Sequence, residues 1–284
     1  MRGYLIRKKF KQQNNSIITH NIDIDEVSEE KSFELLNGKY TGKLKGGKRH
    51  GFGVMVWNDG AKYEGNWEND KANGKGKFYH IDGDIYDGEW KNDKAEGYGE
   101  YKHSNGAVYK GIWKNDTQHG KGIETWEDKS KYEGSYCNGE KEGFGKYKWS
   151  DGSVYEGNWK NNMINGKGTY KWNDGREYVG QWKDNNMHGL GVYKWPDNRK
   201  YEGNYQNDKK HGFGVYVWPD GRRYEGEWKN GKQHGEGRYI LSDGIIKIGK
   251  WEEGRRSMWK EWLNKDGTPI EIDEISKEKS VQAI

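Results

Sequence analysis

The sequence has few of the side chains from which compact cores are usually built. Hydrophobic residues make up only 31% of its 284 residues, and its mean hydropathy is −1.33. No apolar run reaches the length of a membrane-spanning helix, and the N-terminal stretch lacks the apolar core of a signal peptide. Taken alone, this composition is typical of a disordered chain. Folding therefore has to depend on another class of side chain.

Cysteine and proline are also scarce. The single cysteine, Cys137, excludes an intramolecular disulfide and suits a reducing compartment. With 3 Pro beside 43 Gly, we interpret the glycine as structural rather than as linker filler. A net charge of +4, with charges of both signs interspersed, lacks the strong basic field of a nucleic-acid-binding protein. We therefore expect no nucleic acid among the partners.

Aromatic residues are abundant, and they recur at a fixed spacing. The chain has 15 Trp and 20 Tyr, and each of these side chains buries a large area. A 23-residue repeat places tyrosine at residues 40, 63, 86, 109, 132, 155, 178, 201 and 224. A tenth, degenerate unit starts at Lys247 and is expected to break off near Arg256.

Each unit, numbered from its tyrosine as position 1, predicts two short strands. Glycine occupies positions 3, 12 and 14, and tryptophan favours positions 5 and 18. Apolar and polar residues alternate with period 2 along both segments, which is typical of strands with one aromatic face. The Asp-Gly pair at positions 20–21, as in Asp151-Gly152, predicts a three-residue loop with a G1 bulge between units.

One register satisfies both connections. Between units it pairs Tyr147 with Tyr155, Gly145 with Gly157 and Gly143 with Trp159. Within a unit it needs a six-residue loop over positions 6–11, such as residues 160–165, and pairs Tyr155 with Tyr170, Gly157 with Gly168 and Trp159 with Gly166. Each position-5 indole then has a glycine on either side. We predict an all-β fold, an elongated single-layer solenoid of about nine to ten stacked antiparallel β-hairpins with short capping segments at both ends.

The phrase Y-x-G-x-W-x-x-x-x-x-x-G-x-G resembles the MORN repeat. Residues 224–228 and 234–237 match it almost letter for letter, and the resemblance covers residues 40–256. It implies stacked β-hairpins that form an elongated, twisted groove. It also implies scaffold roles in cilia (radial-spoke heads), cell division, the cortical cytoskeleton and membrane junctions, and accessory regions of some phosphoinositide kinases. It implies no catalytic activity for the repeat.

Two flanks border the array. Residues 1–39 are basic and then acidic, and the acidic part predicts a short helix or strand over the edge of the first hairpin. The basic cluster of Arg7, Lys8, Lys9 and Lys11 is a candidate contact for lipid or for an acidic partner, or it is a solvated arm. In residues 257–284, the apolar spacing of Met258–Leu263 predicts a capping turn. Both flanks are candidate contacts with a partner or a second copy.

The sequence shows no motif of enzymatic chemistry outside the repeat. Gly-x-Gly occurs without a Walker lysine or a helix-opening G-x-G-x-x-G, and the kinase triplets H-R-D and D-F-G are missing. Histidine stands at position 11 in five of the nine full units, never more than one per hairpin loop. This spacing is too sparse for a zinc site, so we interpret these as turn residues: His50, His119, His188, His211 and His234. Cys137 is expected to be an inert surface thiol. We expect no enzyme, no cofactor and no metal.

These features predict a non-enzymatic scaffold of a cytoskeletal structure. The resemblance favours a cytoplasmic site in the ciliary axoneme, such as a radial spoke head. Partners would be other proteins or a second copy, bound in an aromatic groove. Its candidate residues are the exposed edges of Trp67, Trp90, Trp113, Trp159, Trp182 and Trp228, with Trp259 and Trp262 in the C-terminal segment. The alternative for these indoles is packing on their own glycines alone.

A second function is a peripheral membrane protein that binds anionic phospholipids such as phosphoinositides, or an accessory to a lipid kinase. Lysines at position 9 motivate it, since each lysine near an anionic surface contributes about 1 kcal/mol. They are Lys48, Lys71, Lys94, Lys209 and Lys232. The column is not basic in the middle units, at residues 117, 140, 163 and 186.

Overall fold

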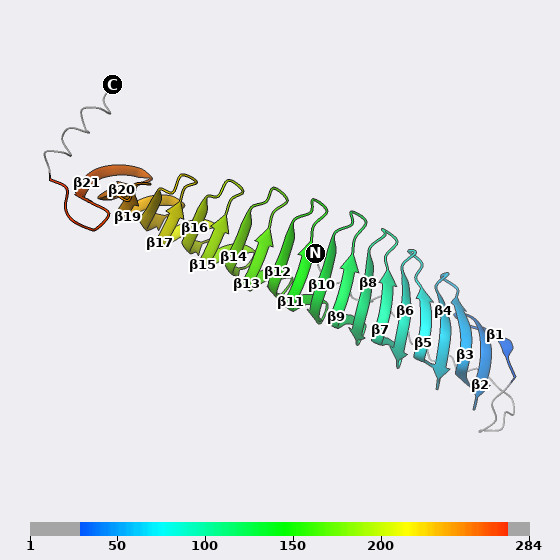
Figure 1. The fold of residues 1–284 in the computed structure, drawn as a ribbon. Coiled ribbons are helices and arrows are strands. Elements are labelled where there is room, and N and C mark those ends of the chain that lie inside the picture. Colours follow the sequence, from blue (N-terminus) through cyan, green and yellow to red (C-terminus); the bar gives the residue numbers. More distant parts are fainter. Residues whose placement is uncertain (1–28, 272–284) are drawn as a thin grey trace. The chain divides into compact units, whose positions relative to one another are not determined.

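The structure, a computed structural model, describes residues 29–271 (Figure 1). Within that range the chain forms β-strands joined by short turns, without a helix, and the pairings between consecutive strands inside each of its two units are antiparallel. The predicted all-β architecture, a single layer of successive β-hairpins, is confirmed. Contacts divide the chain into two units, residues 1–150 with 160–162 and residues 151–159 with 163–284, which are described separately.

The first unit contains eleven strands in chain order, drawn from blue to green in Figure 1. They are β1 Lys31–Leu35, β2 Gly38–Lys45, β3 Lys48–Trp57, β4 Lys62–Glu68, β5 Lys71–Tyr79, β6 Ile85–Lys91, β7 Lys94–Lys102, β8 Val108–Lys114, β9 Thr117–Thr125, β10 Lys131–Cys137 and β11 Glu140–Lys148. β1 pairs with β2 and places Phe33 opposite Tyr40. The sequence left open whether a short helix or a strand covers the edge of the first hairpin, and the structure shows that it is the strand β1.

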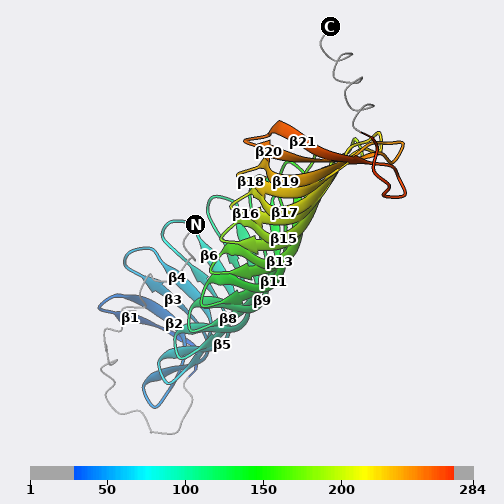
Figure 2. The same ribbon diagram turned by 90° about the vertical axis from the view of Figure 1, so that its left-hand side faces the viewer.

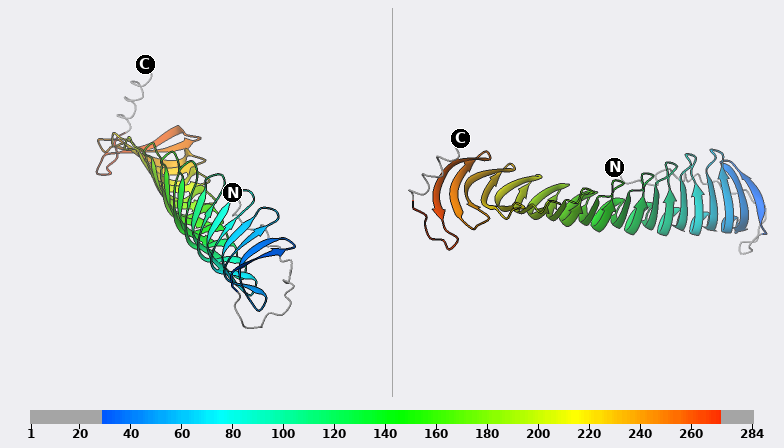
Figure 3. Two further views of the ribbon diagram at one scale, coloured as in Figure 1. Left: turned by 90° about the vertical axis from the view of Figure 1, so that its right-hand side faces the viewer. Right: turned by 45° about the horizontal axis from the view of Figure 1, so that its top comes forward.

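The second unit contains the remaining ten strands, seen from other sides in Figures 2 and 3. They are β12 Val154–Lys160, β13 Met163–Lys171, β14 Glu177–Lys183, β15 Asn186–Lys194, β16 Lys200–Gln206, β17 Lys209–Val217, β18 Arg223–Lys229, β19 Lys232–Ile240, β20 Ile246–Glu252 and β21 Arg255–Leu263.

The C-terminal strand β21 corrects two expectations. The tenth unit does not break off near Arg256, and Met258–Leu263 is strand rather than a capping turn. Trp262 pairs with Lys247, the same pairing of positions 16 and 1 as in the other units. Gly267, at the turn-glycine position of this unit, has φ 85° and its N–H donates to the carbonyl of Asn264 at 2.9 Å. The 23-residue repeat of the structure thus continues through the tenth unit, although this unit lacks the leading tyrosine and the glycines at positions 12 and 14.

The connection between units follows the predicted register. Met55 pairs with Tyr63, Gly53 with Gly65 and Gly51 with Trp67. The Trp57 N–H donates to the carbonyl of Ala61 at 2.9 Å, which closes a three-residue loop whose last residue, Gly60, has φ 92°. This left-handed glycine is the G1-bulge position that the Asp-Gly signal predicts.

The connection within a unit is shorter than predicted. Tyr63 faces Phe78 and Gly65 faces Gly76 as expected, but Trp67 then faces Ala72 at position 10 rather than Gly74 at position 12. The predicted six-residue loop is wrong: it is a two-residue turn, as at Asn161-Asn162 between β12 and β13. Both turn residues have positive φ, here 49° and 64°, as a type I′ turn requires.

A bulge on the second strand explains the difference. The register shifts between Gly65 and Trp67, and Gly74 beside it has φ 79°. Residues 73–75 of β5 oppose the single Asn66, so the register shifts by two residues. A shift of two keeps each side chain on its own face and lets the short turn coexist with the pairing of Gly65 and Gly76. The position-12 glycine is therefore needed for its left-handed backbone, and not to make room for the indole of its own unit.

The core of this single layer is a column of tyrosines lying flat on glycine. Tyr63 is fully buried, and its ring crosses Gly65 and Gly76, where an added Cβ would collide with the phenol. Its Oη donates to the carbonyl of Asn66 at 3.0 Å. The indoles of Trp67 and Trp90 stand edge-on to this ring, with centroids at 5.0 and 5.3 Å. Edge-to-face packing on both sides is what buries a phenol in a sheet only one layer thick.

Candidate partner-binding surface

The position-5 tryptophans belong to this core. Their exposed fraction is only 2–7% in Trp67, Trp90, Trp113, Trp159, Trp182 and Trp228. Several are also anchored by hydrogen bonds, since the indole Nε1–H of Trp67 donates to the carbonyl of Gly53 at 3.1 Å and that of Trp113 to Gly99 at 3.2 Å. Trp262 is 8% exposed and Trp259 is half-buried.

The sequence expectation of exposed indole edges is therefore wrong for the position-5 residues. Their visible contacts are with the tyrosine column and the glycine carbonyls, as in the alternative interpretation of the sequence. A role of these eight tryptophans in binding a partner stays a prediction. The basic cluster of Arg7, Lys8, Lys9 and Lys11 lies outside the described residues.

A different aromatic row reaches the surface in the second unit. It alternates tyrosine at position 16 with tryptophan at position 18, and neighbouring ring centroids are 4.4–5.7 Å apart. Its indoles are half-buried, unlike those at position 5. The row consists of Tyr170, Trp172, Tyr193, Trp195, Tyr216, Trp218 and Tyr239, and we call it the aromatic row.

Arginines from the turns cover the aromatic row. Arg176, Arg199 and Arg222 lie 5.3, 5.3 and 5.8 Å from the centroids of Trp172, Trp195 and Trp218. Each Nε also donates to an aspartate two residues earlier, as in Arg222 and Asp220 at 2.6 Å. The guanidinium groups remain about two-fifths exposed. Partly exposed arginine on tryptophan is a pairing that protein interfaces favour.

Position 10 carries a cation in three of the nine units that start with tyrosine. Arg49, Lys141 and Lys210 face Leu44, Tyr136 and Tyr205 at position 5. In the other six units position 5 is tryptophan and position 10 is uncharged. We call these three side chains the position-10 cations. This covariation is visible in the sequence, but it has meaning only once positions 5 and 10 are known to pair.

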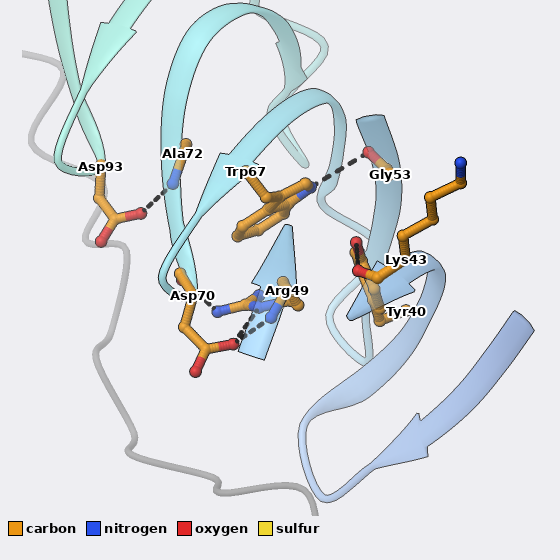
Figure 4. A network of polar contacts seen from close by, with 8 residues as sticks. All are labelled: Tyr40, Lys43, Arg49, Gly53, Trp67, Asp70, Ala72 and Asp93. Carbon is orange, nitrogen blue, oxygen red and sulfur yellow. Dashed lines mark hydrogen bonds and ion pairs between the residues drawn. The ribbon is translucent and has the colours of Figure 1, made fainter. Parts of the chain in front are cut away.

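Arg49 is neutralised from the next unit (Figure 4). Asp70 Oδ1 accepts from the backbone N–H of Arg49 at 2.8 Å and from its Nε at 3.3 Å. The guanidinium stacks 3.9 Å from the centroid of Trp67. Burial lowers the pKa of Arg49, and the charge of Asp70 opposes that effect. The carboxylate at position 8 thus binds two donors of the same cation.

Lys141 is neutralised from the preceding unit. Its Nζ lies 3.2 Å from Oε2 of Glu124, and the phenol of Tyr136 donates to the same oxygen at 3.0 Å. Glu124 stands at position 16, where the other full units carry tyrosine, phenylalanine or methionine. A carboxylate therefore occurs at that position only in the unit that precedes Lys141.

Lys210 is surrounded by rings instead of carboxylates. Its Nζ lies 4.4–5.4 Å from the centroids of Trp195, Tyr201, Tyr216 and Trp228. Burial, together with the positive charge of Arg199, lowers the pKa of the Lys210 ammonium to about 8. Aromatic faces attract a cation, but they carry no net negative charge.

The opposite face of the sheet is polar with isolated apolar side chains. Cross-strand ion pairs join position 2 to its neighbours, as between Lys110 and Glu100 at 2.9 Å, and such exposed pairs contribute little stability. Exposed apolar residues recur at position 13, including Phe52, Tyr98 and Phe213, each more than half exposed. Nothing in the structure shows what covers them.

The other sequence candidates lie apart from one another. The position-11 histidines lie in strands, as His119 does in β9, and not in turns, because the turn is shorter than predicted. Residues 29–271 hold no group of three or more metal-ligating side chains, and none of their elements is a helix able to cross a membrane. Cys137 is exposed at the end of β10, as expected for a surface thiol.

The chain was compared with curated proteins and with solved structures. No curated protein matches the chain. Among solved structures it is similar to the TCP10 domain of Danio rerio CPAP with a STIL peptide, at 12% identity over 74% of this chain and 94% of that one, TM-score 0.44. It is also similar to virginiamycin B lyase from Staphylococcus aureus with quinupristin, at 14% identity over 82% and 73%, TM-score 0.15.

The family comparison is more specific. The model of the MORN repeat matches nine consecutive segments: residues 40–62, 63–85, 86–108, 109–131, 132–154, 155–175, 178–198, 201–222 and 224–246. All nine segments begin at the same residues as the units found from the spacing of tyrosine, and gaps of one or two residues separate the later segments. They cover well over half of the chain, which therefore belongs to the MORN-repeat family.

Proposed function

We propose that this protein is a non-enzymatic scaffold that binds other proteins in a cytoskeletal assembly. MORN repeats suggest a scaffold or a membrane- and lipid-binding role, and the family is typically non-catalytic. The observation that favours protein binding is the aromatic row, in which half-buried Trp172, Trp195 and Trp218 recur at the repeat spacing. A row of identical contacts suits an extended partner that touches several repeats at once.

The cellular site in this proposal is the ciliary axoneme, with a radial spoke head as the favoured complex. This part rests on the resemblance of the repeat to scaffold proteins of that kind. Other proteins of the assembly are the proposed partners, and a second copy of the chain is an alternative occupant of the aromatic row.

Detergent extraction of ciliated cells that carry a tagged full-length copy tests the proposal. The pellet is washed with salt, and the proteins that remain are cross-linked to the tagged chain and identified. We expect the chain to stay with the axoneme and to cross-link to axonemal proteins. Release of the chain by detergent alone, with no cross-links to the cytoskeleton, contradicts the proposal.

A matched pair of double variants tests the aromatic row itself. Arg199→Gln with Arg222→Gln removes two charges that lie over Trp195 and Trp218. Arg223→Gln with Arg238→Gln removes the same number of charges from the other side of the sheet, where both arginines pair with Glu225. We expect only the first pair to reduce retention. Equal retention of the two pairs contradicts a role for the row.

Binding of anionic lipid is the second candidate. Lys48, Lys94 and Lys209 at position 9 are exposed, which is the observation in its favour. Lys232 of the same column is already paired with Glu253 at 3.1 Å. Flotation of the purified chain with vesicles containing phosphatidylserine, together with its release from cells by detergent, supports this candidate instead.

A further inference from the structure

The three position-10 cations differ in one respect. Asp70 neutralises Arg49 and Glu124 neutralises Lys141, each at 3.2–3.3 Å. Around Lys210 both of these carboxylate positions have changed: Tyr193 occupies the position of Glu124, and Gly231 that of Asp70. Among residues 29–271, no carboxylate lies within ion-pair distance of the Lys210 ammonium.

The place of the missing position-8 carboxylate is open. A Cβ added at Gly231 would meet no atom within 4 Å. In the equivalent place, Asp70 sends its carboxylate to both the N–H and the side chain of Arg49. The same position accepts the position-10 N–H in other units, as Asp208 does from Met187 at 2.7 Å. Gly231 has no side chain to do this for Lys210.

Lys210 can be neutralised by an anion that belongs to another molecule. Lys210 is half-buried. An ammonium withdrawn in part from water without a counter-charge is costly, and aromatic rings offset only part of that cost. A single carboxylate neutralises each of the other two position-10 cations. It comes from the next unit for Arg49 and from the preceding unit for Lys141. Charge complementarity therefore favours a carboxylate as the occupant of the open position.

We propose that Lys210 is an anchor for an acidic side chain of a protein partner. The carboxylate of an aspartate or glutamate enters over Gly231 and pairs with the ammonium and the N–H of Lys210. The rest of the partner then lies along the aromatic row, beginning at Trp195 and Tyr216, which line the same ammonium. This inference rests on the proposed scaffold function and names the chemistry that one repeat selects.

The test uses the full-length chain labelled with ¹³C in its lysines, with hexaglutamate capped at both ends as the probe. The ε-methylene signal of Lys210 is assigned by its loss in Lys210→Met. We expect hexaglutamate to shift this signal saturably and to raise the pKa of Lys210 by at least 1 unit. The signal of Lys141, which is already paired with Glu124, and a titration with hexaglutamine are the controls.

Substitution of Gly231 provides the decisive comparison. Gly231→Asp supplies the carboxylate that Asp70 supplies to Arg49, so it should raise the pKa of Lys210 without any peptide and weaken hexaglutamate binding at least tenfold. Gly231→Ala has the same backbone strain at φ 86° without a carboxylate, and it should bind like the wild type. Isothermal titration calorimetry measures hexaglutamate binding to all variants, because Lys210→Met lacks the Lys210 signal. Lys210→Met should lose binding to the same extent as Gly231→Asp, which keeps the test valid if one variant folds poorly.

Several results overturn the proposal. One is a Lys210 signal that hexaglutamate shifts no more than it shifts Lys141, and another is equal binding by Gly231→Asp and Gly231→Ala. A third is a saturable shift with inorganic phosphate or phosphatidylserine vesicles but not with hexaglutamate, which assigns the cation to lipid. If the chain stays on the axoneme while Lys210 ignores hexaglutamate, this inference fails and the scaffold function stands.

Discussion

The ring of Tyr63 lies directly over Gly76 of the neighbouring strand, and no side chain fits between them. Gly76 has ordinary extended backbone, so the glycine is required by the phenol above it and not by its own conformation. The same relationship recurs down the tyrosine column, for example between Tyr201 and Gly214. Glycine in this fold is thus part of the packing of the core.

Gly76→Ala should destabilise the first unit by about 1–3 kcal/mol, because the new methyl group displaces the Tyr63 ring and overpacks the core. Urea unfolding followed by tryptophan fluorescence measures the loss. Gly60→Asn is the matched control, since a Cβ at Gly60 meets nothing within 4 Å and Asn198 has φ 69° at the same turn position of its own unit. A loss as large for Gly60→Asn as for Gly76→Ala would contradict the role given to the ring.

The relation between tyrosine and glycine was only partly predictable. Period 2 and the Asp-Gly turn predict the pairing of Gly53 with Gly65, and the structure confirms it. They do not show that the tyrosine lies along the sheet. That arrangement depends on the flanking indoles, such as Trp67 and Trp90, which belong to two successive units.

The residues at positions 7–8 indicate the two-residue turn within each unit, and the sequence interpretation missed this. Asn and Asp tolerate positive φ, and they stand together at positions 7–8, as in Asn69-Asp70 and Asn207-Asp208. Such a pair predicts a two-residue turn. The alternation of glycine and aromatic residues predicted Trp67 opposite Gly74 instead, because a bulge that shifts the register by two residues leaves a period-2 pattern unchanged.

The buried tyrosine column predicts loss of stability at alkaline pH. Burial raises the pKa of Tyr40 to about 12, and it raises the pKa of Tyr63 still further. Since the folded-state pKa exceeds the value near 10 of an unfolded chain, this contribution is complete below pH 10 and is lost as pH rises through the folded pKa. Urea midpoints measured from pH 8 to 12 should therefore fall above pH 10. A midpoint that stays constant to pH 12 would show that the phenols are accessible.

Asp93→Asn should stabilise the first unit at pH 7. The Ala72 N–H donates to Asp93 Oδ1 at 2.7 Å, and burial raises the pKa of Asp93. The ionised form is thus disfavoured in the folded state, and the cost is fully present above the folded pKa and absent below the unfolded pKa.

Asparagine keeps the acceptor without the charge, as Asn162 does for the Lys141 N–H at 2.8 Å. The gain should be about 0.5–1 kcal/mol at pH 7 and should disappear near pH 3. Asp93→Ala is the control, which should lose about 1 kcal/mol because the N–H has no acceptor. Thermal melts at the two pH values measure the difference, and a gain for Asp93→Asn that is equal at pH 3 would refute the charge argument.

Trp159→Ala and Lys160→Ala separate the two faces of one strand. Trp159 is 7% exposed and stands edge-on to Tyr155 at 5.4 Å, whereas Lys160 is exposed. Removal of the indole should cost about 3–5 kcal/mol and loosen the neighbouring hairpins, whereas removal of the lysine should cost less than about 0.5 kcal/mol. Thermal unfolding of both variants checks this, and similar losses would contradict the assignment of faces.

The account depends most on the division between indoles that build the core and indoles that reach the surface. Hydrogen exchange of the indole N–H groups, followed by NMR, measures that division directly. The indoles of Trp67, Trp113 and Trp228 donate to glycine carbonyls and should exchange as slowly as the most protected strand amides. Those of Trp172, Trp195 and Trp218, half-buried in the aromatic row, should exchange much faster. Equal exchange in the two groups, or faster exchange at position 5, would contradict both the core and the binding surface described for this protein.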